Sequence, residues 1–460
     1  MTDTLMVGVS GVRGIVGKDL TADVVTRWAR GFGLWLHEGT SAGGPGPGLS
    51  VVIGRDARTS GPMFAAAVIA GLESVGCDVI DIGLVPTPTV QLAVEHHRAG
   101  GGIAITASHN PIEWNALKFI GPDGIFLDGV DGARVQQLVG EDGGGRGRTG
   151  KVTTDEGAVG RHLDAVLRLS AVDVESIRAR KFTVALDAVR GAGGPVMRAL
   201  LEGLGCEVAG INLETDGRFP RAPEPVPENL GGLSTLVTRA GAALGIAVDP
   251  DVDRLAIVDE TGRPIGEDYT LAFAIRAVLG GNGGKGVVVC NLSTSLVVED
   301  AARECGADVV RTPVGEVHVA RTIVRLGAVI GGEGNGGVMY PALHAGRDAP
   351  VAAALVLTLL ARDGKRVSEL VAAAPQYTIV KAKVARGPAL EPVYAALRRR
   401  FADGQVDTQD GLRLAWRDRW LHVRPSNTEP IIRLIAEAPS GAPGGAQGLV
   451  DEARRVCAAS

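Results

Sequence analysis

The chain has 460 residues, of which 45% are hydrophobic and 22% charged, and its formal net charge is −5. This length allows about three to four domains, and the slightly acidic charge argues against a nucleic acid partner bound through phosphate contacts. No run of about 18 apolar residues occurs, which argues against a membrane span. The five cysteines are scattered without a CxxC pair, and the N-terminus lacks the pattern of a signal peptide. We therefore expect a cytoplasmic, multidomain protein.

Three segments repeat one plan: an apolar β-branched run, a polar loop, an Ala/Leu-rich stretch with helical spacing, and a second apolar run. They are residues 50–83, 182–212 and 286–313. Each predicts a strand–helix–strand crossover with parallel strands, so we expect three similar α/β domains. The C-terminal part differs, because 393–401 is predicted to be helical and 412–426 to form paired strands before a closing helix. This pattern indicates an α+β module.

Polar or Gly-rich stretches between these units predict the linkers. On this basis we place the domains at 1–150, 151–257, 258–373 and 374–460.

In the first of these domains, an apolar run breaks at "TASHNP", residues 106–111. Ser108 is either a nucleophile at a strand end or a turn residue in a polar loop, and the segment alone leaves both open. Two basic residues lie nearby in the predicted sheet. Arg13 sits in the Gly-flanked turn "SGVRG", where it can bring a guanidinium to an anion, and Lys118 lies on the strand after the serine. Taken singly, each is more often structural than functional.

The second domain ends in "AVDPDVDRLAIVD", residues 247–259, where Asp249, Asp251 and Asp253 alternate. Pro250 argues against a helix, and in an extended chain alternate side chains point the same way. Three converging carboxylates are costly unless a cation neutralises them, and all-oxygen ligands suit Mg²⁺. The sequence therefore predicts a magnesium site.

The pattern of aspartates has two alternative interpretations. One is a solvated acidic turn, although an apolar strand resumes immediately. The other is an EF-hand, since Glu260 is twelfth counting from Asp249, but Arg254 stands sixth, where an EF-hand needs glycine.

The third domain contains "VIGGEGNGGVMYP", residues 329–341, which fits the dinucleotide pattern G-x-G-x-x-G. No helical pattern follows it and the expected acidic residue downstream is missing. We therefore favour a loop whose Glu333 and Asn335 meet sugar hydroxyls. His318 and Arg347 are expected on other loops of this domain.

The C-terminal module contains "RPSNTEPIIRLIAE", residues 424–437. Guanidinium groups, hydroxyls and backbone N–H groups around a tight loop can clamp a dianionic phosphate. The candidate residues are Arg424, Ser426, Asn427, Thr428 and Arg433. The alternative is a hydrophilic turn between strands.

"TASHNP", "DPDVDR", "GEGNGG" and "RPSNTEP" occur in that order, one for each expected domain, and "SGVRG" precedes them. Together they resemble the motifs of the α-D-phosphohexomutases, the family of phosphoglucomutase, phosphomannomutase and phosphoglucosamine mutase. The resemblance covers essentially the whole chain. It implies an α/β fold of three similar α/β domains with mixed sheets, plus a C-terminal α+β domain, around a central cleft.

The resemblance also implies roles for these residues. Ser108 would carry the phosphoryl group, and Mg²⁺, one per active site, would bind the three aspartates and a phosphoserine oxygen. His109, Lys118 and Arg13 match positions associated with proton transfer and charge stabilisation. The positions that would bind substrate are Arg254, His318, Glu333, Asn335, Arg347, Arg424, Ser426, Asn427, Thr428 and Arg433.

The activity implied is interconversion of hexose 6-phosphate and hexose 1-phosphate, with a hexose 1,6-bisphosphate as intermediate and activator. Many bacterial members have a histidine where this chain has Gly337, and the variant resembles an archaeal-type branch of phosphoglucosamine mutases or bifunctional phosphohexomutases, so this loop leaves the hexose open. Glucosamine phosphate is favoured, with glucose and mannose phosphate as alternatives of the same mechanism. A phosphohydrolase using the same serine and an inactive sugar-phosphate-binding protein are the alternatives. The expected partner is a small phosphosugar, and the expected state is a monomer or homodimer.

Overall fold

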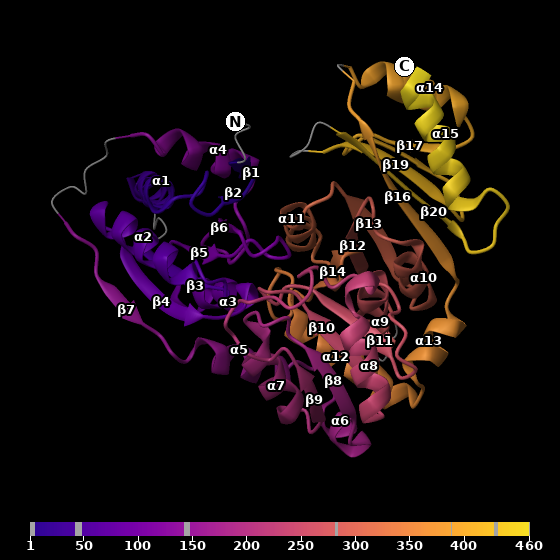
Figure 1. Ribbon diagram of the computed structural model, residues 1–460, viewed down its shortest axis with the longest axis horizontal. Helices are drawn as coiled ribbons and strands as arrows, with labels where there is room; N and C mark the ends of the chain where they lie inside the picture. Colours follow the sequence, from indigo (N-terminus) through magenta and orange to yellow (C-terminus); the bar gives the residue numbers. More distant parts are fainter. Residues whose placement is uncertain are drawn as a thin grey trace.

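The computed structural model describes residues 5–41, 48–141, 148–280, 284–387, 389–426 and 431–459. The described chain forms four β-sheets, each flanked by helices (Figure 1). The first domain lies on the left of Figure 1, the fourth at the upper right, and the second and third at the centre and bottom. The α/β architecture expected from the sequence is confirmed.

The first domain is built on a seven-stranded sheet in the order β1-β2-β6-β5-β3-β4-β7. Its strands are β1 (Met6–Gly8), β2 (Gly11–Ile15), β3 (Ser50–Arg55), β4 (Asp78–Leu84), β5 (Gly101–Ile105), β6 (Trp114–Ile120) and β7 (Val152–Thr154). Its helices are α1 (Ala22–Ser41), α2 (Gly61–Ser74), α3 (Thr87–His97) and α4 (Gly129–Leu138).

The second domain has a four-stranded sheet in the order β11-β10-β8-β9. Its strands are β8 (Thr183–Asp187), β9 (Glu207–Ile211), β10 (Leu244–Val248) and β11 (Leu255–Asp259). Its helices are α5 (Ala158–Leu167), α6 (Val174–Arg180), α7 (Gly193–Gly203), the 3₁₀ turn η1 (Pro227–Asn229) and α8 (Gly231–Ala240).

The third domain repeats this plan with the strand order β13-β12-β14-β15. Its strands are β12 (Val287–Asn291), β13 (Asp308–Thr312), β14 (Ile330–Glu333) and β15 (Gly337–Met339). Its helices are α9 (Asp268–Leu279), α10 (Leu296–Glu304), α11 (Glu316–Leu326), α12 (Ala349–Asp363) and α13 (Val367–Ala373).

The three predicted crossover units are present as β3–α2–β4, β8–α7–β9 and β12–α10–β13, and the two strands of each unit are parallel. Each of these sheets also contains an antiparallel pair that follows the crossover: β5 with β6, β10 with β11, and β14 with β15. The sheets are therefore mixed. The first two of these connections contain the "TASHNP" and "DPDVDR" motifs, and the third, residues 334–336, lies within "GEGNGG".

The fourth domain is an antiparallel sheet in the order β16-β20-β19-β18-β17. Its strands are β16 (Tyr377–Ala385), β17 (Gln405–Asp407), β18 (Leu412–Ala415), β19 (Trp420–Pro425) and β20 (Ile431–Pro439). Helices α14 (Glu391–Arg400) and α15 (Gly445–Ala459) cover its outer side (Figure 1). The predicted helix, paired strands and closing helix are confirmed.

The second and third domains share one hydrophobic core, whereas the first and fourth domains have cores of their own. Helix α12 explains the sharing, because its residues from Ala349 to Leu360 are buried on all sides. It packs on α9 of its own domain and on α5 and α6 of the second domain. A helix that is apolar all round must be covered all round, so the two domains form one unit.

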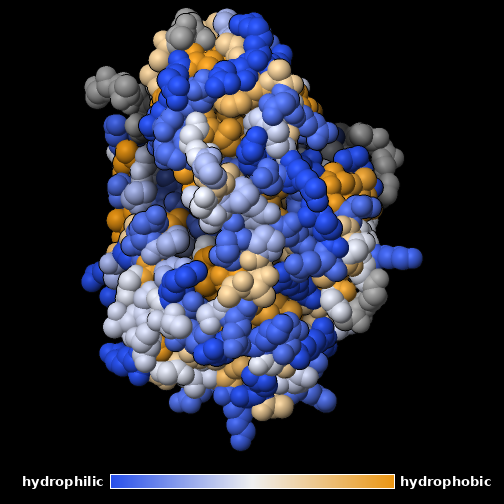
Figure 2. Space-filling model, turned by 90° about the vertical axis from the view of Figure 1, so that its right-hand side faces the viewer, coloured by the Kyte–Doolittle hydropathy of each residue, from blue (hydrophilic) through white to orange (hydrophobic). Residues whose placement is uncertain are grey.

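The side of the molecule shown in Figure 2 is mostly hydrophilic, with hydrophobic residues in small, separate patches. Across the described ranges, no helix combines the length and the apolar character needed to cross a membrane.

A buried polar cluster joins the first three domains. Asp348 Oδ2 lies 2.8 Å from His162 Nε2 and 2.9 Å from His344 Nε2, and Thr89 Oγ1 lies 2.9 Å from His162 Nδ1. Asp348 also caps α12, since its Oδ1 accepts a hydrogen bond from Val351 N. Burial alone would raise the pKa of Asp348, but its histidine partners hold that pKa below the ordinary value.

Replacement of Asp348 by alanine should lower the free energy of unfolding by about 3 kcal/mol, because it leaves buried polar partners unsatisfied. Chemical denaturation measures the loss. The control is Asp164→Ala on α5, whose side chain is 68% exposed and pairs only with Arg168 across one helical turn. That change should cost about 0.5 kcal/mol or less, and equal losses for the two variants would contradict this role for Asp348.

Candidate active site

Ser108 is held in the loop between β5 and β6 with an unusual backbone conformation. Its φ of 49° lies in the left-handed region, which costs a non-glycine residue about 1 kcal/mol or more. Its N–H donates to Thr106 Oγ1 at 2.9 Å, and its hydroxyl donates to Asp249 Oδ2 at 2.8 Å. The loop therefore aims a buried serine hydroxyl at the acidic loop of the second domain.

The sequence analysis missed the residue that holds this loop, Arg58. Its guanidinium is fully buried and paired with Asp56 at 3.1 Å. It donates to four loop carbonyl oxygens at 2.6 to 2.9 Å, those of Ser108, Asn110, Pro111 and Trp114. A charged pair directly after the carboxyl end of β3, in "GRDAR", was the signal available in the sequence.

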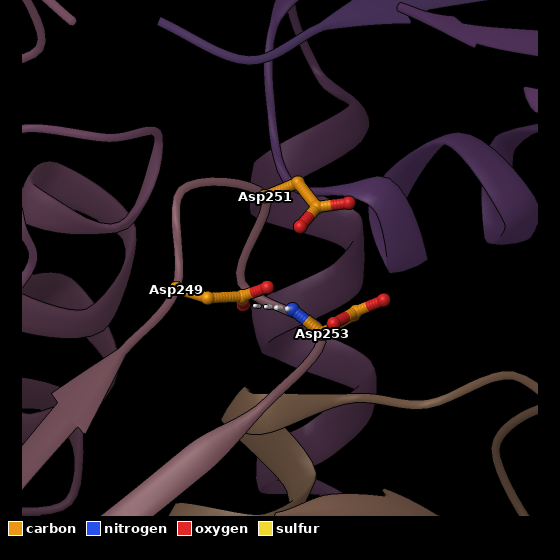
Figure 3. A group of neighbouring side chains, drawn as sticks. All are labelled: Asp249, Asp251 and Asp253. Carbon is orange, nitrogen blue, oxygen red and sulfur yellow. Dashed lines mark hydrogen bonds between the residues drawn. The ribbon is translucent and has the colours of Figure 1, made fainter. Parts of the chain in front are cut away.

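The three aspartates converge on one side of the loop between β10 and β11 (Figure 3). One carboxylate oxygen from each lies within 4.8 Å of the others. The expected reason for this convergence was wrong: the segment is a tight turn rather than an extended strand. In this turn, Val252 N donates to the Asp249 carbonyl at 3.1 Å and Asp253 N to Asp249 Oδ1 at 3.2 Å.

The aspartate cluster fits a divalent cation. Asp251 Oδ1 and Asp253 Oδ1 are buried and have no hydrogen-bond partner within the described part of the chain. Burial, followed by the charges of Asp253 and Asp251, raises the pKa of Asp249 well above its ordinary value. Unpaired buried carboxylate oxygens and mutual repulsion are both relieved by a hard cation with oxygen ligands.

Lys118 Nζ provides part of the countercharge, 2.7 Å from Asp251 Oδ2 and 3.7 Å from Asp253 Oδ2. Thr87 Oγ1 donates to the same Asp251 oxygen at 2.8 Å. Burial would lower the pKa of Lys118, but Asp251 and Asp253 raise it above the ordinary value. The amine therefore stays protonated.

His109 and Arg13 also lie close to the serine loop. Arg13 donates to Asn110 Oδ1 at 2.7 Å. His109 Nδ1 is 3.4 Å from Ser108 Oγ. The charge of Arg254, then burial and the charge of Arg13, lower the pKa of His109 to about 2. At neutral pH His109 is consequently an uncharged imidazole.

Arg254 and His318 have different surroundings. Arg254 lies between the metal loop and Glu224, with a guanidinium nitrogen 3.3 Å from Glu224 Oε1 and Nε 3.7 Å from Asp253 Oδ1. His318 was expected on a loop, but it lies in the first turn of α11 and is exposed. Glu224 was not singled out from the sequence, and it lies 4.0 Å from His109 Nε2.

Glu333, at the end of β14, is held by both of its carboxylate oxygens. Oε1 accepts hydrogen bonds from Asn291 Nδ2 at 2.9 Å and Gly315 N at 3.2 Å, and Oε2 lies 2.8 Å from the Arg347 guanidinium. Asn335 Oδ1 accepts from the backbone N–H of the second residue after it, at 3.1 Å. Hydrogen bonds from within the chain thus fix the side chains of both Glu333 and Asn335.

Arg347, in the segment between β15 and α12, is buried among carboxylates. Its guanidinium lies 2.6 Å from Asp253, 3.0 Å from Glu316 and 2.8 Å from Glu333. Its side chain also occupies the space beside Gly337: a Cβ there would lie 2.2 Å from Arg347 Cδ. The glycine noted in the sequence is therefore required by the position of this arginine.

In the fourth domain, Arg424 and Arg433 are directly opposite each other on β19 and β20. Arg424 Nε lies 3.0 Å from Asp410 Oδ2, and Arg433 donates to Ser426 Oγ at 3.5 Å. Asn427 and Thr428, also expected here, lie outside the described residues.

A cavity of about 1060 Å³ connects these parts. Its lining runs from His109 of the first domain past Glu224 and Glu267 to Lys381 and Arg433 of the fourth. Of the residues predicted from the sequence, His109 and Arg433 line this cavity, which brings the serine loop of the first domain and the arginine pair of the fourth to one opening.

Four protein-family models match the chain in succession. They are the phosphoglucomutase/phosphomannomutase alpha/beta/alpha domains I, II and III, over residues 4–143, 160–262 and 266–377, and the C-terminal domain of the same family, over 379–447.

Individual proteins match over nearly the full length. A protein from Thermococcus kodakarensis described as phosphoglucomutase/phosphomannomutase is 40% identical over 440 residues, and one from Methanopyrus kandleri described as probable phosphoglucosamine mutase is 40% identical over 441. Each alignment covers 94% of both chains. The crystal structure of a phosphoglucomutase/phosphomannomutase family protein from Burkholderia thailandensis aligns with a TM-score of 0.85 at 28% identity, over 98% of this chain and 96% of that chain.

Mg²⁺ should stabilise the protein through the aspartate cluster, by about 2.7 kcal/mol at a hundred times its dissociation constant. Asp249→Asn should abolish this gain, and it should not destabilise the metal-free protein, because it removes one of three repelling charges. Thermal unfolding with and without Mg²⁺ measures both effects. The control Asp23→Asn changes a side chain that is 78% exposed on α1 and should keep the full response to Mg²⁺. An unchanged Mg²⁺ response in the Asp249 variant would refute the site.

Gly337→Ala should displace Arg347 and cost about 1–3 kcal/mol of stability, as overpacking of a buried site does. Gly160→Ala is the matched control, since nothing lies within 4 Å of a Cβ at that position of α5; the control should be neutral or slightly stabilising. Chemical denaturation compares the two. A neutral Gly337 variant would show that Arg347 has room to move.

Proposed function

Because this chain belongs to the phosphoglucomutase/phosphomannomutase family of mutases, we propose that it interconverts hexose 6-phosphate and hexose 1-phosphate through a phosphoserine at Ser108. The observation that carries this proposal is the position of Ser108 Oγ, 2.8 Å from Asp249 of the aspartate cluster. A serine that carries a phosphoryl group needs a cation and fixed positive groups beside it, and the site offers both.

In the first half of the reaction, the phosphoryl group on Ser108 Oγ passes to the free hydroxyl of the bound hexose phosphate. The O–P bond at the serine breaks, a new one forms at the sugar, and a hexose 1,6-bisphosphate results. The bisphosphate then reorients in the site so that its two phosphates exchange places. In the second half, its other phosphoryl group passes to Ser108. The enzyme returns to its starting state, so no phosphate is consumed.

His109 and Lys118 have distinct roles beside the serine. His109 is uncharged and next to Ser108, so it can form a hydrogen bond with the hydroxyl that gives or receives the phosphoryl group, although its lowered pKa makes it a weak base. Lys118 stays protonated and stabilises the negative charge that develops on the phosphoryl oxygens. Mg²⁺, held by the three aspartates and a phosphoserine oxygen, would supply further charge stabilisation.

The sugar and the non-reacting phosphate are bound by separate parts of the cleft. Glu333 and Asn335 would hold sugar hydroxyls, with Arg254 and His318 nearby. Arg424 and Arg433, together with the "SNT" loop, would hold the phosphate that is not reacting. Contacts with hydroxyl groups can form in two orientations of the sugar, and the bisphosphate must adopt both when it reorients in the site. Arg347 would act through Glu333, because three carboxylates already surround its guanidinium.

We propose glucosamine phosphate as the preferred substrate, acted on in the cytoplasm by a monomer or homodimer. The relative from Methanopyrus kandleri described as a probable phosphoglucosamine mutase supports this choice. Gly337, where many bacterial family members have histidine, agrees with the same branch of the family. A hexose 1,6-bisphosphate would activate the enzyme by phosphorylating Ser108.

Ser108→Ala should lower turnover by a factor on the order of 10³ or more, because it removes the group that carries phosphate. The assay supplies glucosamine, glucose, mannose and N-acetylglucosamine 6-phosphates side by side, with Mg²⁺ and a trace of 1,6-bisphosphate. It follows both 1-phosphate formation and release of inorganic phosphate.

The control Ser74→Ala changes a hydroxyl that only bonds the Gly71 carbonyl within α2, and it should keep full activity. Full turnover by the Ser108 variant would disprove the phosphoserine. Phosphate release faster than isomer formation would identify a hydrolase instead, and a faster rate with another sugar would displace glucosamine phosphate as the preferred substrate.

A further inference from the structure

Asp410, in the turn between β17 and β18, contacts both the phosphate-binding part of the fourth domain and the third domain. Its Oδ2 lies 3.0 Å from Arg424 Nε. The same oxygen accepts a hydrogen bond from Val314 N of the third domain at 3.1 Å. Its side chain is only 17% exposed. One carboxylate oxygen therefore touches the candidate phosphate ligand and the neighbouring domain at once.

The backbone of Asp410 is attached to the third domain by a second route, through His422. His422 Nε2 lies 2.7 Å from the Asp410 carbonyl oxygen, and Nδ1 lies 2.8 Å from Ser293 Oγ. A carbonyl oxygen can only accept, so Nε2 carries the proton and Ser293 donates to Nδ1. Burial lowers the pKa of His422 to about 4, which keeps the ring neutral and this arrangement intact at neutral pH. The sequence pattern had offered no partner for this histidine.

The two loops of the third domain that hold Asp410 also hold Glu333. Asn291, whose Oδ1 accepts from Ser293 N at 2.9 Å, donates from Nδ2 to Glu333 Oε1. Gly315, which follows Val314, donates its N–H to that same Glu333 oxygen at 3.2 Å. The phosphate-binding arginine and the sugar-binding glutamate are thus mounted on the same two segments, residues 291–293 and 314–315.

We propose that Asp410 is a positioning residue that orients Arg424 and sets its place relative to Glu333, so that the non-reacting phosphate and the sugar hydroxyls are held at a fixed separation. This inference rests on the proposed function, since it assigns Arg424 to the phosphate and Glu333 to the sugar. It adds a connection between them that runs through one side chain. Asp410 itself touches no reacting atom.

The test compares Asp410→Asn and Asp410→Ala in steady-state kinetics with glucosamine 6-phosphate. Asparagine keeps an oxygen for the Val314 N–H but loses the charge beside Arg424, whereas alanine loses both contacts. Arg424 would bind the non-reacting phosphate equally in the ground and transition states, so its misplacement should raise KM and leave kcat nearly unchanged. We expect KM to rise about tenfold for alanine and by a smaller factor for asparagine.

The matched control is Asp407→Asn, which changes an acid at the end of β17, three residues before Asp410. The Asp407 side chain accepts hydrogen bonds from Gln409. A second measurement repeats the Asp410 substitutions in an Arg424→Ala background. If Asp410 acts through Arg424, most of its effect on KM should vanish there, as expected for coupled residues. A merely structural role would give the same loss in both backgrounds.

The inference is overturned if both Asp410 variants match Asp407→Asn in KM, if kcat falls instead of KM rising, or if the effect persists unchanged without Arg424. Should the alanine variant fail to fold, the asparagine variant still decides, because it preserves the contact between the domains. If the wild-type protein converts no hexose phosphate, the proposed function fails. If the wild-type protein is active and the Asp410 variants have the same KM as the wild-type protein, only this inference is refuted.

Discussion

The burial of three aspartates within one turn is the constraint on which the rest of the site depends. At an effective dielectric of about 20, two like charges 4 Å apart repel by about 4 kcal/mol, so the cluster exists only with countercharge beside it. The first, second and third domains each supply one cation: Lys118, Arg254 and Arg347. The contacts between these three domains therefore also offset the negative charge of the aspartates.

The sheets explain how distant parts of the chain reach this cluster. In each α/β domain, an antiparallel strand follows the parallel crossover, and the short connection between them leaves the sheet at one edge. Because such a connection is short and both of its ends are fixed by paired strands, its side chains have little freedom to change position. The second and third domains are fused by a common core, whereas polar contacts at Asp410, His422 and Glu437 attach the fourth.

Much of this could be predicted from the sequence, because it depends on local patterns. The crossover units follow from apolar periodicity, and the aspartate cluster follows from spacing, although a turn rather than an extended strand brings its members together. The roles of Arg58 and Asp410 were not predicted. The charged pair in "GRDAR" marks a polar loop, but it does not indicate the four carbonyl groups 50 to 56 residues away that Arg58 bonds, and nothing local links Asp410 to Val314 of the third domain. His318 was expected on a loop but lies in the first turn of α11, which begins directly after Gly315.

The need to balance the charge of the buried aspartates also determines which residue fits at position 337, the first residue of β15. Arg347 must reach Asp253 to balance the buried charge, and its side chain crosses the sugar loop on the way, where it also pairs with Glu333. The space it fills is the space that a side chain at position 337 would need. A histidine at 337 and an arginine at 347 are therefore sterically exclusive in this backbone. The arginine that balances the buried charge of Asp253 and Glu333 thus also restricts position 337 to a residue without a side chain.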